Sequence, residues 1–175
     1  MDAIDLHVHS TFSDGTLTPS ELVSRAKQFH LAAMALTDHD TIEGIPEAVQ
    51  AAREQNLELV PGVELSTFWD EKEIHIVGLF IDYTDKTFQK ELESLRDVRR
   101  NRNITMCEKF TQLGIPIDYS DMEKEYADAV ITRAHFADYA SFLLHGNGQR
   151  NTNPNAVMRI SPSPYRVRIT LLWWT

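Results

Sequence analysis

Asp5-Leu6-His7-Val8-His9 is the stretch around which we expect this 175-residue chain to fold. Its alternation of polar and apolar residues predicts a strand. Successive side chains of a strand point to opposite faces, so His7 and His9 would project from the same face. The two imidazoles would then share one small volume, and imidazole is a common ligand of transition metals.

Four further candidate ligands follow in short motifs. They are Asp14 in Ser13-Asp14-Gly15, His39 in Thr37-Asp38-His39-Asp40, Glu64 in Pro61-Gly62-Val63-Glu64, and His75. A lone histidine in a folded protein is usually structural or exposed, but the repetition of such residues after strand-like runs favours a shared metal site. Nitrogen and carboxylate ligands together suit Zn, Mn or Fe, and so many ligands indicate more than one ion.

Strand-like and helix-like stretches alternate along the first half of the chain. We expect strands over Ala3–Val8, Leu31–Thr37 and Leu57–Val60, a helix that begins at Thr18-Pro19-Ser20-Glu21, a second helix over Gly44–Asn56, and a further strand or hairpin arm over Glu73–Asp82 with His75 at its start. This alternation predicts βαβ units, a parallel sheet and an α/β fold class. Sites in such folds form at the carboxyl ends of strands, where we expect His9, His39 and Glu64.

Composition narrows the class of protein. A chain of 175 residues is long enough for one domain with a real core. The net charge of −9 argues against a broad nucleic-acid-coating surface. The single cysteine, Cys107, excludes a disulfide within the chain and fits a reducing compartment. With no basic apolar leader and no run long enough to cross a bilayer, we expect a soluble cytoplasmic protein without a membrane or protein partner.

Several motifs, in the same order, resemble the PHP family, the polymerase and histidinol phosphatase superfamily. They are His-x-His near the N-terminus, Ser-Asp-Gly, Thr-Asp-His-Asp, Pro-Gly-Val-Glu and Glu-Ile-His-Ile. The sequence is most similar to the bacterial branch that removes the 3′-phosphate from 3′,5′-bisphosphonucleosides and trims RNA from its 5′ end. The resemblance covers residues 1 to about 140.

The resemblance implies a distorted (β/α)7 barrel with up to three divalent metals, Mn first and Zn or Fe as alternatives. The implied metal ligands are His7, His9, Asp14, His39, Glu64 and His75, with Glu64 as a bridge. The implied activity is hydrolysis of nucleotide or short RNA phosphate esters by metal-bound hydroxide, without a side-chain nucleophile. Three alternatives stay open: a phosphatase for a small non-nucleotide ester, a DNA exonuclease, or an inactive metal-binding fragment. The fragment alternative arises because the family's later ligands, a His and an Asp-x-His pair, have no counterpart in this sequence.

A long helix is expected over Lys86–Gly114. Apolar residues recur at spacings of three and four and form one stripe, which Arg99 and Arg102 interrupt. Guanidinium groups suit bidentate phosphate contacts, so both arginines are candidate ligands of substrate phosphate. The alternatives are that they snorkel to water or form a structural ion pair.

A second pair of phosphate candidates lies further along the chain. The segment Ile131–Ala137 resembles a motif that the same branch carries in a small insertion, where Arg133 and His135 would face the site. The alternative is a helix N-terminus with Thr132 as its cap.

The chain changes character near residue 140. All acidic residues lie at or before Asp138, and the final segment is basic. We therefore expect a metal-binding barrel part over 1–85, a helix and insertion or lid over 86–140, and an aberrant or disordered basic tail over 141–175. A truncated or frame-shifted reading would explain that tail, and a natural tail for an anionic partner is the alternative.

Overall fold

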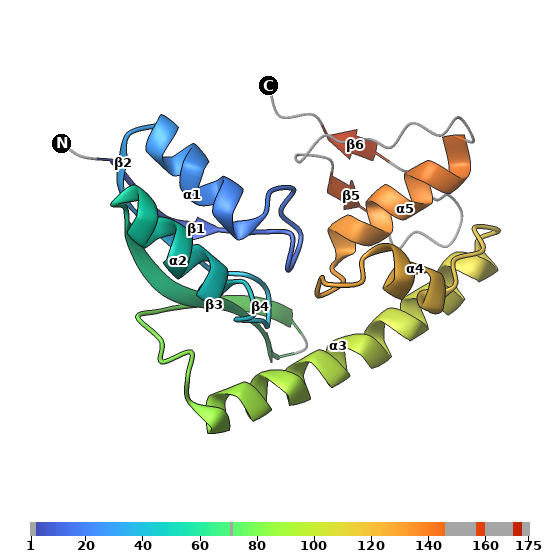
Figure 1. Cartoon of the computed structure of the whole chain (residues 1–175). Helices are drawn as coiled ribbons and strands as arrows, with labels where there is room; N and C mark the ends of the chain where they lie inside the picture. The colour runs from blue at the N-terminus through green and yellow to red at the C-terminus, as the bar shows by residue number, and fades with distance from the viewer. Residues whose placement is uncertain (1–2, 71, 146–156, 160–169, 173–175) are drawn as a thin grey trace. The chain divides into compact units, whose positions relative to one another are not determined.

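The computed structural model describes residues 3–70, 72–145, 157–159 and 170–172 (Figure 1). The chain forms two compact units, Met1–Asn101 with Asp128–Val130, and Arg102–Ala127 with Ile131–Thr175. The elements are β1 (Ala3–Val8), α1 (Pro19–Gln28), β2 (Leu31–Leu36), α2 (Ile45–Gln55), β3 (Glu58–Trp69), β4 (Lys72–Leu79), α3 (Lys86–Gln112), α4 (Tyr119–Glu125), α5 (Arg133–His145), β5 (Val157–Arg159) and β6 (Thr170–Leu172). Most of the expected tail, 141–175, lies outside the described residues. Within the described part, no helix is both long and apolar enough to cross a membrane.

The first unit is built on one mixed sheet with the strand order β1-β2-β3-β4. β1 pairs with β2, and β2 pairs with β3, in parallel, as the βαβ pattern predicted. β3 and β4 instead form an antiparallel hairpin, in which Gly62 pairs with Leu79 and Trp69 pairs with Lys72. The α/β fold class is confirmed, and the sheet resembles part of a barrel because β3 curves strongly along its length (Figure 1).

The third strand is longer than expected, and this changes the positions of two candidate ligands. It does not end at Val60 but continues through the Pro-Gly-Val-Glu motif to Trp69. The chain stays extended because β4 supplies hydrogen-bond partners to the second half of β3 once the pairing with β2 ends at Pro61. Glu64 and His75 therefore lie within strands, and their predicted positions at a strand end and a strand start were wrong.

Two short helices are held by local signals that the sequence already carried. Thr18 caps α1, because its side chain accepts from the Glu21 amide and the Glu21 side chain accepts from the Thr18 amide. α2 ends at Asn56, which adopts a left-handed φ of 51°. Buried small residues let both helices pack closely with β2. This core comprises Val23, Ala26, Met34, Ala51, Ala52 and Leu57.

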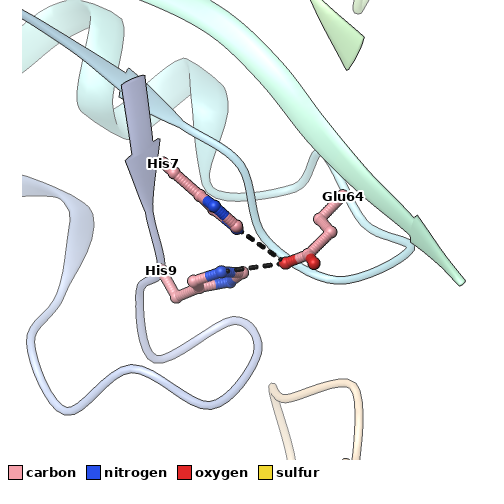
Figure 2. Close-up of side chains that lie close together, drawn as sticks. All are labelled: His7, His9 and Glu64. Atoms are coloured by element: carbon pink, nitrogen blue, oxygen red, sulfur yellow. Dashed lines mark hydrogen bonds and ion pairs between the residues drawn. The ribbon is translucent and has the colours of Figure 1, made fainter. Parts of the chain in front are cut away.

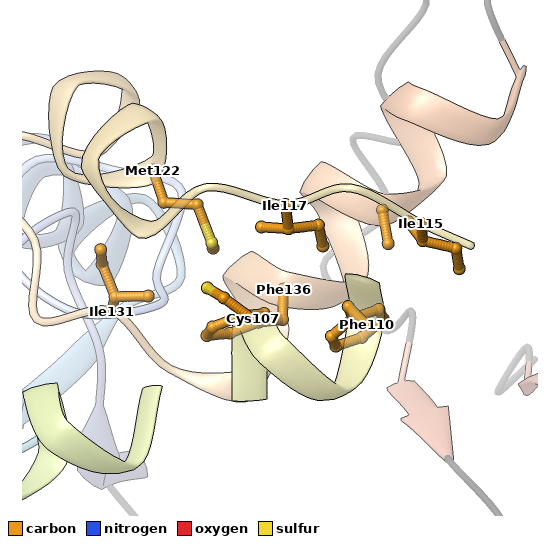
Figure 3. Close-up of a cluster of buried hydrophobic side chains, with 8 residues drawn as sticks. Cys107, Phe110, Ile115, Ile117, Met122, Ile131 and Phe136 are labelled. Carbon is orange, nitrogen blue, oxygen red and sulfur yellow. The ribbon is translucent and has the colours of Figure 1, made fainter. Parts of the chain in front are cut away.

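The second unit has its own apolar core, drawn in Figure 3. Its buried residues come from α3, α4, α5 and the segments between them: Cys107, Phe110, Ile115, Ile117, Met122, Ile131, Phe136 and Ala140. Burial raises the pKa of the Cys107 thiol to about 11, so this side chain stays protonated near neutral pH. Cys107 is therefore a packing residue.

α3 belongs to both units as one continuous helix. Leu92 is buried in the first unit and Phe110 in the second, so the predicted apolar stripe serves two separate cores. Arg99 and Arg102 occupy the stretch between them.

Candidate metal centre

His7, His9 and Glu64 meet at the end of β1 (Figure 2). His7 lies in β1 and His9 follows its last residue, and both project toward β3 as the strand alternation predicted. The Nε2 atoms of His7 and His9 lie 2.9 and 3.0 Å from the same Glu64 oxygen, Oε2. A single carboxylate oxygen thus contacts two imidazoles.

The remaining three candidates complete the cluster. His75 Nδ1 lies 2.9 Å from Glu64 Oε1, on the other side of the carboxylate. His39 lies between two acids, with Nε2 3.5 Å from Asp14 Oδ2 and Nδ1 3.5 Å from Glu64 Oε2. Three overlapping groups have ligand atoms within 4.8 Å of one another: His7, His9 and Glu64; His9, Asp14 and His39; His39, Glu64 and His75. The structure therefore brings together all six residues that were singled out as ligands.

Backbone pairing sets the positions of His39 and Glu64. The two residues form an isolated parallel bridge just beyond the carboxyl end of β2. The Glu64 amide donates to the Asp38 carbonyl at 3.1 Å, and the Asp40 amide donates to the Glu64 carbonyl at 3.0 Å. The loop after β2 thus continues the sheet for one residue pair, and that pair carries two of the candidate ligands.

Asp38 holds the loop that carries Asp14. Its buried carboxylate accepts from the Ser10 amide at 2.7 Å, the Ser10 hydroxyl at 2.6 Å and the Ser13 hydroxyl at 2.6 Å. These three bonds fix the turn between His9 and Asp14. The sequence analysis missed this role, although the position of Asp38 beside His39 was a usable signal.

Electrostatics keep Glu64 ionised. Burial alone would raise its pKa, but the hydrogen bond from His7, the charge of His39 and the hydrogen bond from His75 outweigh burial and lower it. An ionised carboxylate surrounded by imidazoles is ready to accept cations.

The pKa values of His9 and His39 are shifted in opposite directions. Burial, followed by repulsion from His39, lowers the pKa of His9. Burial would also lower the pKa of His39, but the hydrogen bond to Asp14 and the charges of Asp14 and Glu64 outweigh it and raise the pKa.

The donor set fits divalent metal ions. Imidazole nitrogen and carboxylate oxygen are the ligands that Zn, Mn and Fe accept. In addition, His39 Nδ1 is buried and makes no hydrogen bond among the described residues. A buried polar atom without a hydrogen bond is costly, and coordination to a cation would satisfy it.

Arg99 forms the ion pair that was one of its alternatives. Its Nε and one terminal nitrogen lie 2.9 and 2.5 Å from Asp40 Oδ2, and the same terminal nitrogen donates to the Ser66 hydroxyl. Both side chains of the pair are buried. A direct contact between Arg99 and substrate phosphate stays a prediction.

The other phosphate candidates belong to the second unit. Arg102 donates to the neighbouring Asn103 side chain at 3.3 Å, and Arg133 is exposed at the first residue of α5. Thr132 caps this helix, because its hydroxyl accepts from the Ala134 amide at 3.2 Å. His135 Nδ1 accepts from the Thr132 amide at 2.9 Å, so His135 helps to close the same cap. Phosphate binding by Arg102, Arg133 and His135 stays a prediction.

The chain is similar to proteins of known activity. It is 48% identical over 135 residues to a 5′-3′ exoribonuclease of Haemophilus influenzae, covering 77% of this chain and 49% of that protein. It is 40% identical over 139 residues to a 3′,5′-nucleoside bisphosphate phosphatase of Chromobacterium violaceum, covering 78% of this chain and 48% of that protein. The chain thus spans about half the length of these curated relatives.

Solved structures agree on the fold. A proposed metal-dependent phosphoesterase from Bifidobacterium adolescentis superposes with a TM-score of 0.73 at 30% identity, over 83% of this chain and 51% of that one. The model of the PHP domain matches residues 5–153, which is most of the sequence and extends past the expected limit near residue 140. The resemblance drawn from the motifs is confirmed: this chain belongs to the PHP domain family.

Proposed function

We propose that the chain carries the metal centre of a phosphoesterase that hydrolyses phosphate esters of nucleotides. The observation that carries this proposal is the convergence of six candidate nitrogen and oxygen ligands, the Glu64 carboxylate among them, in one cluster. A cluster of this size exceeds what a single four-coordinate ion needs, so we propose two or three divalent ions, Mn²⁺ first and Zn or Fe as alternatives.

Each residue of the cluster has a role in this proposal. Glu64 would be shared between ions, because both of its oxygens face imidazoles. His7, His9 and His75 would hold ions together with it, and Asp14 and His39 would complete the set. Bound divalent ions would lower the pKa of water for attack on phosphorus and offset the charge of the phosphoryl oxygens.

Two hydroxyls beside the cluster and the single thiol of the chain are not set up as nucleophiles. The hydroxyls of Ser10 and Ser13 are buried and donate to Asp38, so their protons are already engaged. The Cys107 thiol stays protonated in the second unit. These contacts support the expectation that water, not a residue, attacks the ester.

The names of two relatives support a substrate class. One relative is named for degrading RNA from its 5′ end and another for releasing phosphate from a 3′,5′-nucleoside bisphosphate. Both reactions break a phosphoester bond of a nucleotide, and the same centre could serve either. We propose a 3′,5′-bisphosphonucleoside and short RNA as substrates, with phosphate orientation by Arg102, Arg133 and His135.

Metal titration tests the centre. The chain should bind Mn²⁺, and His9→Ala should reduce the bound metal because His9 contributes to two of the three ligand groups. His30→Asn is the control: His30 follows α1 outside the cluster and has a φ of 56°, a conformation that asparagine tolerates. Equal loss of metal in both variants would overturn the assignment.

Measured turnover distinguishes a phosphoesterase from an inactive metal-binding fragment. Slow, Mn²⁺-dependent release of phosphate from a 3′,5′-bisphosphonucleoside, abolished by His9→Ala, is the expected result. Metal binding without turnover on either the bisphosphonucleoside or 5′-phosphorylated RNA would favour the alternative that this chain is a metal-binding fragment.

A further inference from the structure

Arg99 is a buried arginine whose charge is neutralised by a partner within the first unit. Its side chain is 7% exposed and that of its partner Asp40 is 1% exposed. Burying two charges is costly and is tolerated only where their geometry is good and further hydrogen bonds support them. Here the Nε and one terminal nitrogen of Arg99 donate to Asp40 Oδ2 at 2.9 and 2.5 Å. The same terminal nitrogen also donates to the Ser66 hydroxyl.

Asp40 connects this ion pair to the candidate ligands. It follows His39 directly, and its amide donates to the Glu64 carbonyl at 3.0 Å. Its other carboxylate oxygen, Oδ1, accepts from the Ser66 amide at 2.8 Å, two residues beyond Glu64 on β3. The Asp40 carboxylate therefore ties the loop after β2 to β3, and Arg99 ties both to α3.

The backbone of Asp40 needs such support. Its φ is 52°, a left-handed conformation that costs a residue with a side chain some free energy and persists where surrounding contacts hold it. If the Asp40 carboxylate loses its partners, the loop can relax, and the bridge between His39 and Glu64 relaxes with it.

We propose that Arg99 is a positioning residue of the metal centre: through Asp40 it fixes His39 and Glu64 at the separation that coordination requires. This inference rests on the proposed metal centre and assigns Arg99 a role through Asp40, in place of the predicted contact with substrate phosphate. Arg99 directs its hydrogen bonds to Asp40, in the loop after β2 that also carries His39. The Asp40 carboxylate neutralises the charge of Arg99.

The experiment compares Arg99→Gln, Arg99→Lys and Asp40→Asn with the unsubstituted chain. Arg100→Gln is the matched control, because Arg100 lies on the same helix with an exposed side chain. Two quantities are measured: the Kd for Mn²⁺, and the hydrogen-exchange rates of the Asp40 and Glu64 amides in the metal-free chain. Loss of support around metal ligands typically weakens affinity about 10–100-fold, and we expect this for Arg99→Gln and Asp40→Asn.

Three further features distinguish positioning from general stabilisation. Both amides should exchange faster in Arg99→Gln, while the Arg100→Gln chain matches the unsubstituted one. Arg99→Lys keeps the charge but loses the planar fork, so it should fall between the two. The double variant Arg99→Gln with Asp40→Asn should weaken Mn²⁺ binding no more than either single substitution, because Arg99 and Asp40 act as one unit.

A purely structural role gives a different pattern. If the Arg99 variants lower Tm but leave both the Kd and the two exchange rates unchanged, the inference is overturned. If Arg99→Gln does not fold, Arg99→Lys replaces it in the comparison, and a Kd and two exchange rates equal to those of the unsubstituted chain in that variant overturn the inference as well. Failure of the unsubstituted chain to bind Mn²⁺ would instead reject the metal centre itself, and this inference with it.

Discussion

At the scale of the residue, three adjacent residues of the motif Thr37-Asp38-His39-Asp40 have different structural roles. His39 faces the cluster, Asp38 holds the preceding loop, and Asp40 pairs with Arg99. The candidate ligands were identified from residue type and spacing because metal chemistry accepts few side chains. The roles of the flanking acids were not, because they depend on partners 28 and 59 residues away.

The pH dependence of metal binding should follow His39. Its pKa is raised above the ordinary value of 6.5, so it is the buried histidine that holds a proton to the higher pH. Coordination needs the neutral imidazole, so Mn²⁺ affinity is fully developed above the raised pKa and falls as pH drops through it. The pKa of His9 is lowered, so His9 stays neutral to a lower pH than His39 does. His9 therefore does not set the pH at which Mn²⁺ affinity begins to fall.

Calorimetric titration with Mn²⁺ from about pH 8 to about pH 6 checks this prediction. Once His39 is protonated, affinity should fall roughly tenfold for each pH unit, the slope for one displaced proton. The heat of binding should also differ between buffers of different ionisation enthalpy, because binding releases that proton. A His39→Asn chain should lose this slope. A Kd that does not change over the range would contradict the prediction.

At the scale of the element, local signals were predictable and long-range pairing was not. The start of α1 was predicted because the cap, the proline and the glutamate of its first turn are adjacent in sequence. The end of β3 was missed because its extension from Val60 to Trp69 depends on β4, which the sequence suggested only as a strand or hairpin arm. The same pairing places Glu64 and His75 within strands.

The loop after β1 should tolerate no side chain at Gly15. A Cβ on Gly15 would lie 2.1 Å from the His9 carbonyl oxygen and 2.8 Å from the Ser10 amide nitrogen, and both of these atoms belong to the backbone. Gly15→Ala must therefore shift the loop that carries Asp14 or the end of β1 that carries His9. We expect a loss of about 1–3 kcal/mol in the free energy of unfolding, as in other overpacked sites, and weaker Mn²⁺ binding.

Gly78→Ala is the matched control for this substitution. A Cβ on Gly78 meets nothing nearer than 3.6 Å, which is ordinary van der Waals contact. Thermal unfolding and Mn²⁺ titration of both variants make the comparison. Similar behaviour of the two chains would show that the loop after β1 has more freedom than its close backbone contacts indicate.

At the scale of the whole molecule, the first unit exposes much apolar surface. β1 and β4 each pair with a single described strand, so the sheet has two edges. On the β3–β4 hairpin and just after it, several large apolar residues are exposed: Phe68, Trp69, Ile74, Ile76, Val77 and Phe80. Exposed apolar side chains and strand edges of this kind favour association between chains. This surface lies on the antiparallel hairpin.

We therefore expect the 175-residue chain to aggregate readily. If the hairpin surface is responsible, Ile74→Thr combined with Ile76→Thr should raise the temperature at which light scattering begins. Ile74 and Ile76 are 42% and 52% exposed and alternate with His75, so the change should leave the metal ligands in place. Threonine keeps the β-branch that strands favour while removing apolar area.

Ile45→Thr, at a position only 1% exposed, should instead destabilise the unit and promote aggregation. Purification of the unsubstituted chain as a cooperatively melting monomer would show the prediction to be wrong.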